Sequence, residues 1–67
     1  MFQLDPWEKA ADCDRALRLT IDPVRREQLV NIQKSWISLA NQQPFLSEAE
    51  LAERAETIGR LHAELDQ

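Results

Sequence analysis

The sequence is poor in the residues that most covalent, catalytic and metal sites require. Its 67 residues include one cysteine, one histidine and one glycine, and only 6% are aromatic. The single cysteine, Cys13, excludes an intramolecular disulfide, whereas small secreted domains usually contain several. The lone Gly59 and the lone His62 leave neither a glycine-rich phosphate loop nor a paired metal-ligand motif. We therefore expect neither a cofactor nor a metal.

The length and hydropathy of the chain exclude further classes of protein. The chain is too short for a doubly wound sheet or a barrel, so we expect one small domain over residues 1–67. No stretch approaches the roughly 20 apolar residues of a membrane-spanning helix. The first residues have neither the basic nor the apolar region of a signal peptide. Hydrophobic residues still make up 43% of the chain, too many for a disordered tail. These features predict a soluble, cytoplasmic protein.

Charge is unevenly distributed along the chain. Residues 1–46 contain six acidic and six basic side chains, whereas residues 47–67 contain six acidic side chains against Arg54 and Arg60. The formal net charge of −4 therefore resides in the last third. Nucleic-acid binding generally requires a basic surface, so we do not expect it of this chain.

Three helix starts are marked by capping residues. Asp5-Pro6 and Asp22-Pro23 each place a carboxylate at the N-cap and a proline at the first helical position. Ser47 and Glu50 have the spacing of a capping box. Prolines disfavour helix at the residue that precedes them, which predicts breaks before Pro23 and Pro44. We predict helices over residues 6–20, 23–42 and 48–65, with a turn near Ile21–Asp22 and a loop over 43–47.

Apolar residues follow helical spacing in all three segments. In the second segment they span about half of the helix circumference. A sector of that width needs two neighbours, so we expect the second helix to lie in the middle. Its apolar residues are Leu29, Ile32, Trp36, Leu39 and Ala40, flanked by Val30 and Ile37. The corresponding residues are Trp7, Ala10, Cys13, Leu17 and Ile21 in the first helix and Leu51, Ala55, Ile58, His62 and Leu65 in the third.

These features predict an all-α protein, an antiparallel helical hairpin with a third amphipathic helix that together form a small bundle. The first turn is too short for any other arrangement of the first two helices. Phe45 and Leu46 are expected to cover one end of the core. A chain of this size buries only about 60% of its unfolded surface, so we expect a homo-oligomer, with a dimer favoured, to complete the bundle. The residues expected at that interface are Trp7, Val30, Ile37, Leu51, Ile58 and Leu65.

Four arginines, Arg15, Arg18, Arg25 and Arg26, lie on either side of the predicted turn. The first two suit the C-terminal end of a helix, whereas the last two stand at a helix start, where anions are preferred. Two explanations remain open. The arginines contact a phosphate, a nucleic acid or an acidic partner, or they form ion pairs with nearby aspartates and with the acidic third helix. The second explanation is the more common one.

Cys13 and His62 could form a nucleophilic pair only if the fold placed them in contact beside an oxyanion site. We expect the commoner roles instead, a small buried hydrophobe and a polar residue in a helix seam. Because no cluster of acid, base and nucleophile is present in the pattern, we predict a protein without enzymatic activity. It is expected to act by self-association or by docking on a protein partner. A small nucleic-acid-binding regulator that uses the arginines is the alternative.

Residues 7–42 resemble a group of short helical proteins from alphaproteobacteria. That group reads Ala-x-x-Cys, eight further residues, Asp-Pro-x-x-Arg-x-x-Leu and then Trp-x-x-Leu-Ala. The residues that carry the resemblance here are Ala10, Asp12, Cys13, Asp22, Pro23, Arg26, Leu29, Trp36, Leu39 and Ala40. The resemblance implies a bacterial helical hairpin and no biochemical role, since the group has no assigned one. The third predicted helix lies outside it.

Overall fold

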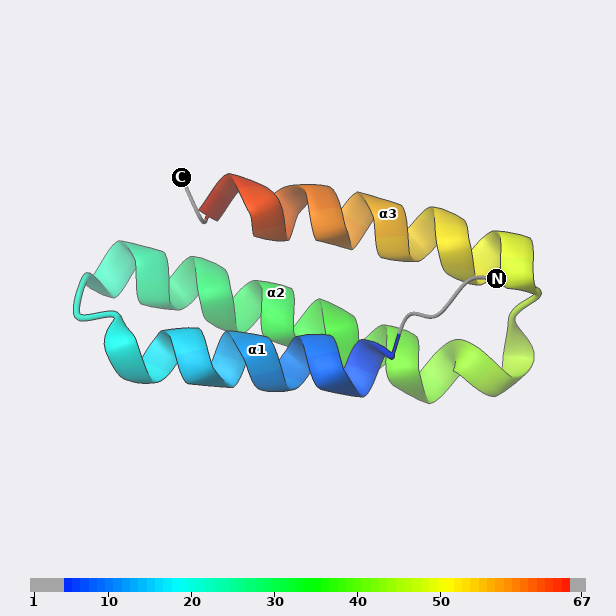
Figure 1. Ribbon diagram of the computed structural model, residues 1–67, viewed down its shortest axis with the longest axis horizontal. Helices are drawn as coiled ribbons and strands as arrows, with labels where there is room; N and C mark the ends of the chain where they lie inside the picture. Colours follow the sequence, from blue (N-terminus) through cyan, green and yellow to red (C-terminus); the bar gives the residue numbers. More distant parts are fainter. Residues whose placement is uncertain (1–4, 66–67) are drawn as a thin grey trace.

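The computed structural model describes residues 5–65, so the first four and last two residues of the predicted domain lie outside the described part. The described residues form three α-helices and no strand: α1 (Pro6–Leu19), α2 (Pro23–Gln42) and α3 (Glu48–Leu65), with a short 3₁₀ turn, η1 (Gln43–Phe45), after α2. Helix α2 runs antiparallel to both α1 and α3 (Figure 1). The predicted all-α bundle is confirmed, and only the end of α1 differs, by one residue.

The first two helix starts are held by the predicted aspartate caps. The Trp7 backbone N–H donates to the Asp5 carboxylate at 3.0 Å, and the Val24 backbone N–H donates to the Asp22 carboxylate at 3.1 Å. Each cap satisfies one of the amide groups that have no partner in the first turn of a helix. A proline follows each cap, where its missing N–H costs no hydrogen bond.

Helix α3 starts with a complete capping box. The Glu50 backbone N–H donates to the Ser47 hydroxyl at 3.1 Å, and the Ser47 backbone N–H donates to the Glu50 carboxylate at 3.2 Å. The Ser47 backbone N–H is the main cause that lowers the pKa of Glu50 below the usual carboxyl value, followed by the Ser47 hydroxyl, with Arg54 adding to it. The reciprocal bonds fix where α3 begins after the loop.

Acidification is expected to loosen the start of α3. Because the pKa of Glu50 is lower in the folded chain than in the unfolded one, its carboxylate stabilises the fold at neutral pH. That contribution is lost as the pH falls through the lowered pKa. An NMR pH titration of the first turn of α3 measures it, with Glu50→Gln as the control, since glutamine keeps the acceptor without the charge. A Glu50 carboxyl that titrates at or above the usual value contradicts the expectation.

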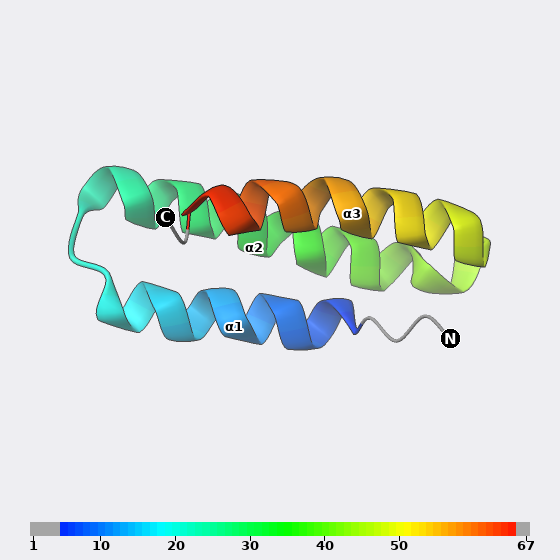
Figure 2. The ribbon, with the colours of Figure 1, turned by 45° about the horizontal axis from the view of Figure 1, so that its top comes forward.

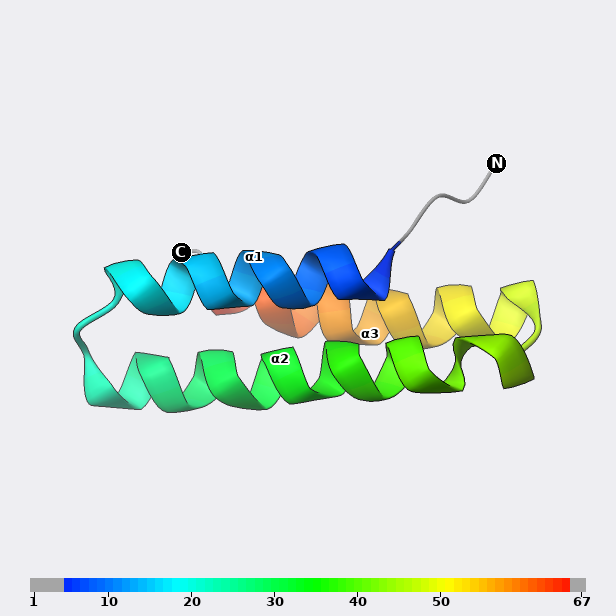
Figure 3. The same ribbon diagram turned by 90° about the horizontal axis from the view of Figure 1, so that it is seen from below.

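The three helices surround one core in a triangular arrangement, with α2 against both neighbours. Figure 2 places α3 in front of α2, and Figure 3 shows α1 and α2 side by side with α3 behind them. The Gln33 side-chain amide donates to the Ala10 carbonyl on α1, and the Arg54 guanidinium on α3 donates to Gln42. Opposite sides of α2 therefore face different helices. The shared core consists of Ala10, Cys13, Ile32, Trp36, Leu39, Leu51 and Ala55.

The central position predicted for the second helix is confirmed, but its apolar sector needs no second chain. Val30 and Ile37, expected at an interface, are already partly buried, and Ile37 packs against the core. Helices α1 and α3 of the same molecule cover the two sides of the sector. The width of the sector is therefore not an argument for self-association, and any such argument has to come from another surface.

Three apolar residues near element ends are more exposed than their spacing suggested. Phe45 was expected to cover the core but is 86% exposed, and only Leu46 packs inward. Ile21 is 96% exposed because α1 ends at Leu19 and the chain turns away before reaching it. Trp7, on the first turn of α1, is 53% exposed.

Candidate functional site

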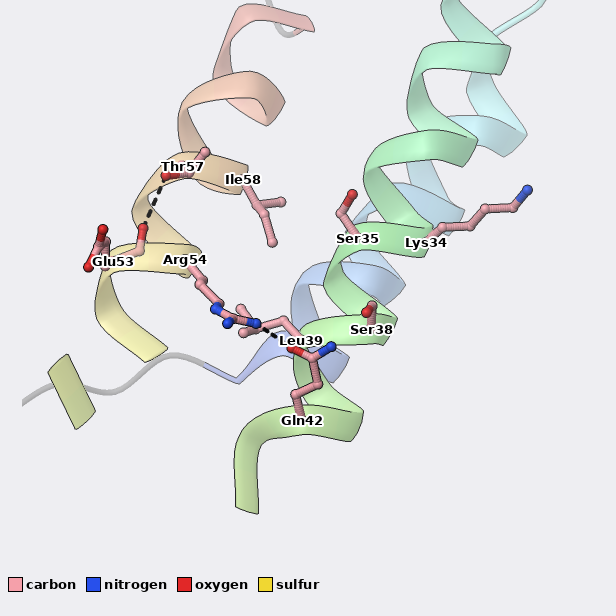
Figure 4. A pocket seen from close by; sticks show the side chains of 9 residues that line it. All are labelled: Lys34, Ser35, Ser38, Leu39, Gln42, Glu53, Arg54, Thr57 and Ile58. Carbon is pink, nitrogen blue, oxygen red and sulfur yellow. Dashed lines mark hydrogen bonds between the residues drawn. The ribbon is translucent and has the colours of Figure 1, made fainter. Parts of the chain in front are cut away.

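A groove runs along the outer side of α2 and α3, on the side of α2 that faces α3 and away from α1. It encloses a hollow of about 500 Å³ (Figure 4). Residues from three successive turns of α2 and two successive turns of α3 line it. They are Lys34, Ser35, Ser38, Leu39 and Gln42 on α2, and Glu53, Arg54, Thr57 and Ile58 on α3. Hereafter these nine residues are called the α2–α3 groove.

The floor of the α2–α3 groove is apolar. Leu39 is buried, and Ile58 is partly buried against the core. Arg54 reaches across the floor near Leu39 and donates to the side-chain oxygen of Gln42, which closes one end of the hollow (Figure 4). Beyond Ile58, the half-exposed Leu61 lies one turn further along the same side of α3. The groove therefore continues as apolar surface toward the end of α3.

Two of the three hydroxyl groups that line the groove, those of Ser35 and Thr57, are turned back onto their own helices. The Ser35 hydroxyl donates to the Asn31 carbonyl at 3.1 Å, and the Thr57 hydroxyl donates to the Glu53 carbonyl at 3.2 Å. Because two of its hydroxyl donors are already used, the groove suits packing of another side chain better than recognition of a polar small molecule.

The outer rims of the groove carry opposite charges. Lys34 stands at the edge formed by α2, and Glu53 stands at the opposite edge formed by α3, with the hollow between them (Figure 4). Both side chains are exposed. Arg54, the neighbour of Glu53, binds Gln42, which follows Lys34 by eight positions on α2, so Lys34 and Glu53 stand near opposite ends of the hollow.

Cys13, Trp36 and His62 form a second cluster, inside the bundle, that joins all three helices. The Trp36 indole N–H donates to His62 Nδ1 at 3.4 Å, and His62 Nε2 lies 3.9 Å from Cys13 Sγ. The tryptophan and histidine rings are 6.4 Å apart and tilted by 59°. Cys13 is fully buried, and Trp36 is 1% exposed. The contact between Cys13 and His62 spans 49 positions of sequence.

The hydrogen bond from Trp36 determines which ring nitrogen of His62 acts as an acceptor and which as a donor. An indole N–H only donates, so Nδ1 of His62 accepts, and the hydrogen of the neutral ring sits on Nε2. Nε2 then points a hydrogen, not a lone pair, at Cys13. A nucleophilic pair needs an imidazole nitrogen that can take the thiol proton, and a metal ligand needs a free lone pair. This geometry favours a structural role for the three residues.

A second hollow, of about 540 Å³, opens between α1 and α3 beside this cluster. Lys9 and Asp12 line it from α1, and Gly59 and His62 line it from α3. A Cβ atom added at Gly59 would meet nothing within 4 Å, so the packing of the described residues does not require a glycine there. Among residues 5–65, no group of three or more potential metal-binding side chains occurs.

The arginines near the hairpin turn are engaged within the chain. Arg15 pairs with Asp12, and Arg18 pairs with Asp14 at 3.0 Å, both along α1. Arg26 reaches back across the turn and donates to the carbonyl oxygens of Leu17 and Thr20 at the end of α1. Arg25 is exposed and also has an interaction partner.

The residues predicted for an interface are dispersed over the fold. Leu51 is buried in the core, and Leu65 is partly buried against it. Ile58 is the one predicted interface residue that lines the α2–α3 groove. Sequence reasoning missed Ser35 and Ser38, because serines on the polar side of an amphipathic helix carry no signal of a groove. Only the position of α3 turns them into its wall.

No protein-family model, no curated protein and no solved structure matches the chain. The resemblance to alphaproteobacterial helical proteins therefore stays a prediction. None of the three described helices is long and apolar enough to cross a membrane.

Proposed function

We propose that this chain is a non-enzymatic helical protein that acts by self-association, and that the α2–α3 groove is the surface it uses. The observation that carries the proposal is the groove itself, a hollow of about 500 Å³ over an apolar floor on the outside of the bundle. Docking on a different protein would use the same groove. Concave apolar surfaces on small proteins commonly mark interaction sites.

The chemistry of the groove supports packing against another protein. Ser35 and Thr57 spend their hydroxyl donors within their own helices. The half-exposed Leu61 extends the apolar surface beyond the floor. A helix or a second bundle laid along the groove would remove this apolar area from water, which stabilises a complex by about 25 cal/mol for each Å².

The nucleic-acid alternative has less support. It needs arginine side chains that can turn to phosphates, and each neutralised phosphate must release counterions. Arg15 and Arg18 are paired with aspartates, and Arg26 is bound to two backbone carbonyls. Turning these groups outward would break contacts within the chain.

The thermal midpoint of the wild-type chain is expected to rise with protein concentration. Association that favours the folded state makes the midpoint concentration-dependent by mass action. Calorimetry over about a hundredfold concentration range, together with the mass from light scattering, measures it. Leu61→Glu is the companion variant, because Leu61 is half exposed and its replacement leaves the core intact. A constant midpoint together with a monomeric mass contradicts self-association.

A further inference from the structure

We propose that His62 is a proton-controlled switch, whose ring leaves the Trp36 indole when it is protonated and turns to the Asp12 carboxylate across the hollow between α1 and α3. The neutral ring links α3 to the central helix α2, because the Trp36 indole N–H donates to its Nδ1 at 3.4 Å. The protonated ring links α3 to α1 instead. This exchange takes place within one chain and does not depend on self-association.

A second proton on the imidazole is incompatible with the bond from Trp36. In the neutral ring Nδ1 accepts from the indole, while Nε2 carries the hydrogen and lies 3.9 Å from the Cys13 sulfur. A proton taken from water binds Nδ1, the one ring nitrogen with a lone pair, and turns it into a donor. Two N–H groups would then point at each other. The protonated ring therefore has to leave its place beside the indole, and His62 is exposed enough for water to reach it.

The hollow beside the cluster offers the ring a second position. It has a volume of about 540 Å³. On α3 its lining consists of His62 and of three residues with little or no side chain, Ala55, Gly59 and Ala63. Gly59 stands one turn before His62, and even a Cβ atom there would meet nothing within 4 Å. The imidazole can therefore rotate into the hollow without displacing a side chain of its own helix.

The charged groups that line the hollow come from α1. Asp12 presents a carboxylate, which forms a stronger bond with a charged imidazole than a neutral acceptor does. Its Oδ1 binds Arg15, and a carboxylate has a second oxygen that accepts. Lys9, one turn earlier, opposes the charged ring, and among the described lining residues α2 contributes only the uncharged Trp36. Asp66, one turn after His62 in the sequence, lies outside the described residues.

The direction of the pH dependence follows from the proton. Protons favour the arrangement that binds them, so the bond from Trp36 is held at higher pH and is exchanged as the pH falls. Histidine ordinarily changes charge between about pH 5 and pH 8, a range in which most carboxyl groups stay ionised and most thiols stay neutral. The chain contains one histidine. Because α3 also forms one wall of the α2–α3 groove, the exchange couples acidity to that surface.

NMR of the indole and imidazole signals tests the exchange. As the pH is lowered from about 8 to about 5, solvent exchange of the Trp36 indole N–H is expected to become at least about tenfold faster than in His62→Asn at the same pH. The change is expected to share its midpoint with protonation of the ring. Asparagine keeps an acceptor near the position of Nδ1 but takes no proton, so this variant also controls for the α-amino group. Trp7→Phe identifies the Trp36 signal.

Asp12→Asn tests the second position of the ring. Removing the carboxylate is expected to move the midpoint to lower pH by at least about half a unit, because an opposite charge nearby favours the charged ring. Asp14→Asn is the matched control. Asp14 also pairs with an arginine along α1, Arg18, but it is not among the residues that line the hollow. Its replacement is expected to leave the midpoint near that of the wild type.

Each alternative outcome overturns the exchange. A ring that is protonated while the indole N–H exchanges as slowly as in His62→Asn overturns it, and so does a ring that stays neutral down to about pH 5. Equal midpoints for Asp12→Asn and Asp14→Asn overturn it as well. If circular dichroism shows that His62→Asn does not fold, the two aspartate variants still decide. A monomeric wild-type chain contradicts the proposed function and leaves these measurements unchanged.

Discussion

Replacing Trp36 with alanine is expected to lower the free energy of unfolding by about 3–5 kcal/mol, the usual cost of removing a buried large side chain. Trp36 is 1% exposed and is the largest fully buried side chain among residues 5–65. It lies on the central helix, packs in the core shared by all three helices and donates to His62. Alanine would create a cavity where the three helices meet. It would also remove the indole N–H that donates to His62.

Such a loss is a large part of the roughly 5–15 kcal/mol that holds a typical domain folded. Urea unfolding followed by circular dichroism measures it. Trp7→Ala is the matched control, and since Trp7 is 53% exposed, we expect it to cost less than half as much. Trp36→Phe keeps a ring in the core, and its loss of unfolding free energy is expected to lie between those of Trp7→Ala and Trp36→Ala. This variant preserves the test if Trp36→Ala does not fold. Equal losses for Trp36→Ala and Trp7→Ala would refute the central role of Trp36.

The second large effect is expected at Arg26. Its guanidinium donates to the carbonyl oxygens of Leu17 and Thr20 at the end of α1, where the Leu17 carbonyl also accepts from the Thr20 backbone N–H. Its positive charge also interacts favourably with the negative end of the helix dipole. Arg26→Met keeps the aliphatic part of the side chain and removes both bonds. We expect the free energy of unfolding to fall by about 1–2 kcal/mol.

A matched arginine gives the comparison for this measurement. Arg60 pairs with Glu56 on its own helix, and both side chains are well exposed. Exposed pairs of this type contribute about 0.3–0.5 kcal/mol, so Arg60→Met is expected to have little effect in the same urea experiment. If Arg26→Met is no more costly than Arg60→Met, the link across the hairpin turn does not stabilise the fold. The result also tests whether the arginines form an anion site, because the Arg26 guanidinium cannot bind the carbonyls at the end of α1 and an external anion at the same time.

The helix boundaries were predictable because they depend on chemistry within a few residues. Asp5 and Asp22 bind amides two positions ahead, and Ser47 and Glu50 bind each other across three. The central helix was predictable for a related reason. Its buried residues repeat every three or four positions, and its apolar sector was wide enough to require two neighbours.

Exposure at element ends was not predictable from the same pattern. Periodicity tells on which side of a helix a residue lies, but not how far the neighbouring helices extend. Ile21 shares a face with Cys13 and Leu17, yet it follows the last turn of α1 and is almost fully exposed. Phe45 is apolar and lies in the 3₁₀ turn, where its side chain points away from the core.

The sequence by itself determined the three helices, their caps and the face that each one buries, because these follow from interactions between residues close in the chain. Only the tertiary structure decided which distant residues meet. It placed Cys13 beside His62, Arg26 under the end of α1, and Ser35 and Ser38 across from Thr57 in a common groove. Such contacts depend on the relative position of whole helices, and that position results from packing all three around Trp36, not from any local pattern.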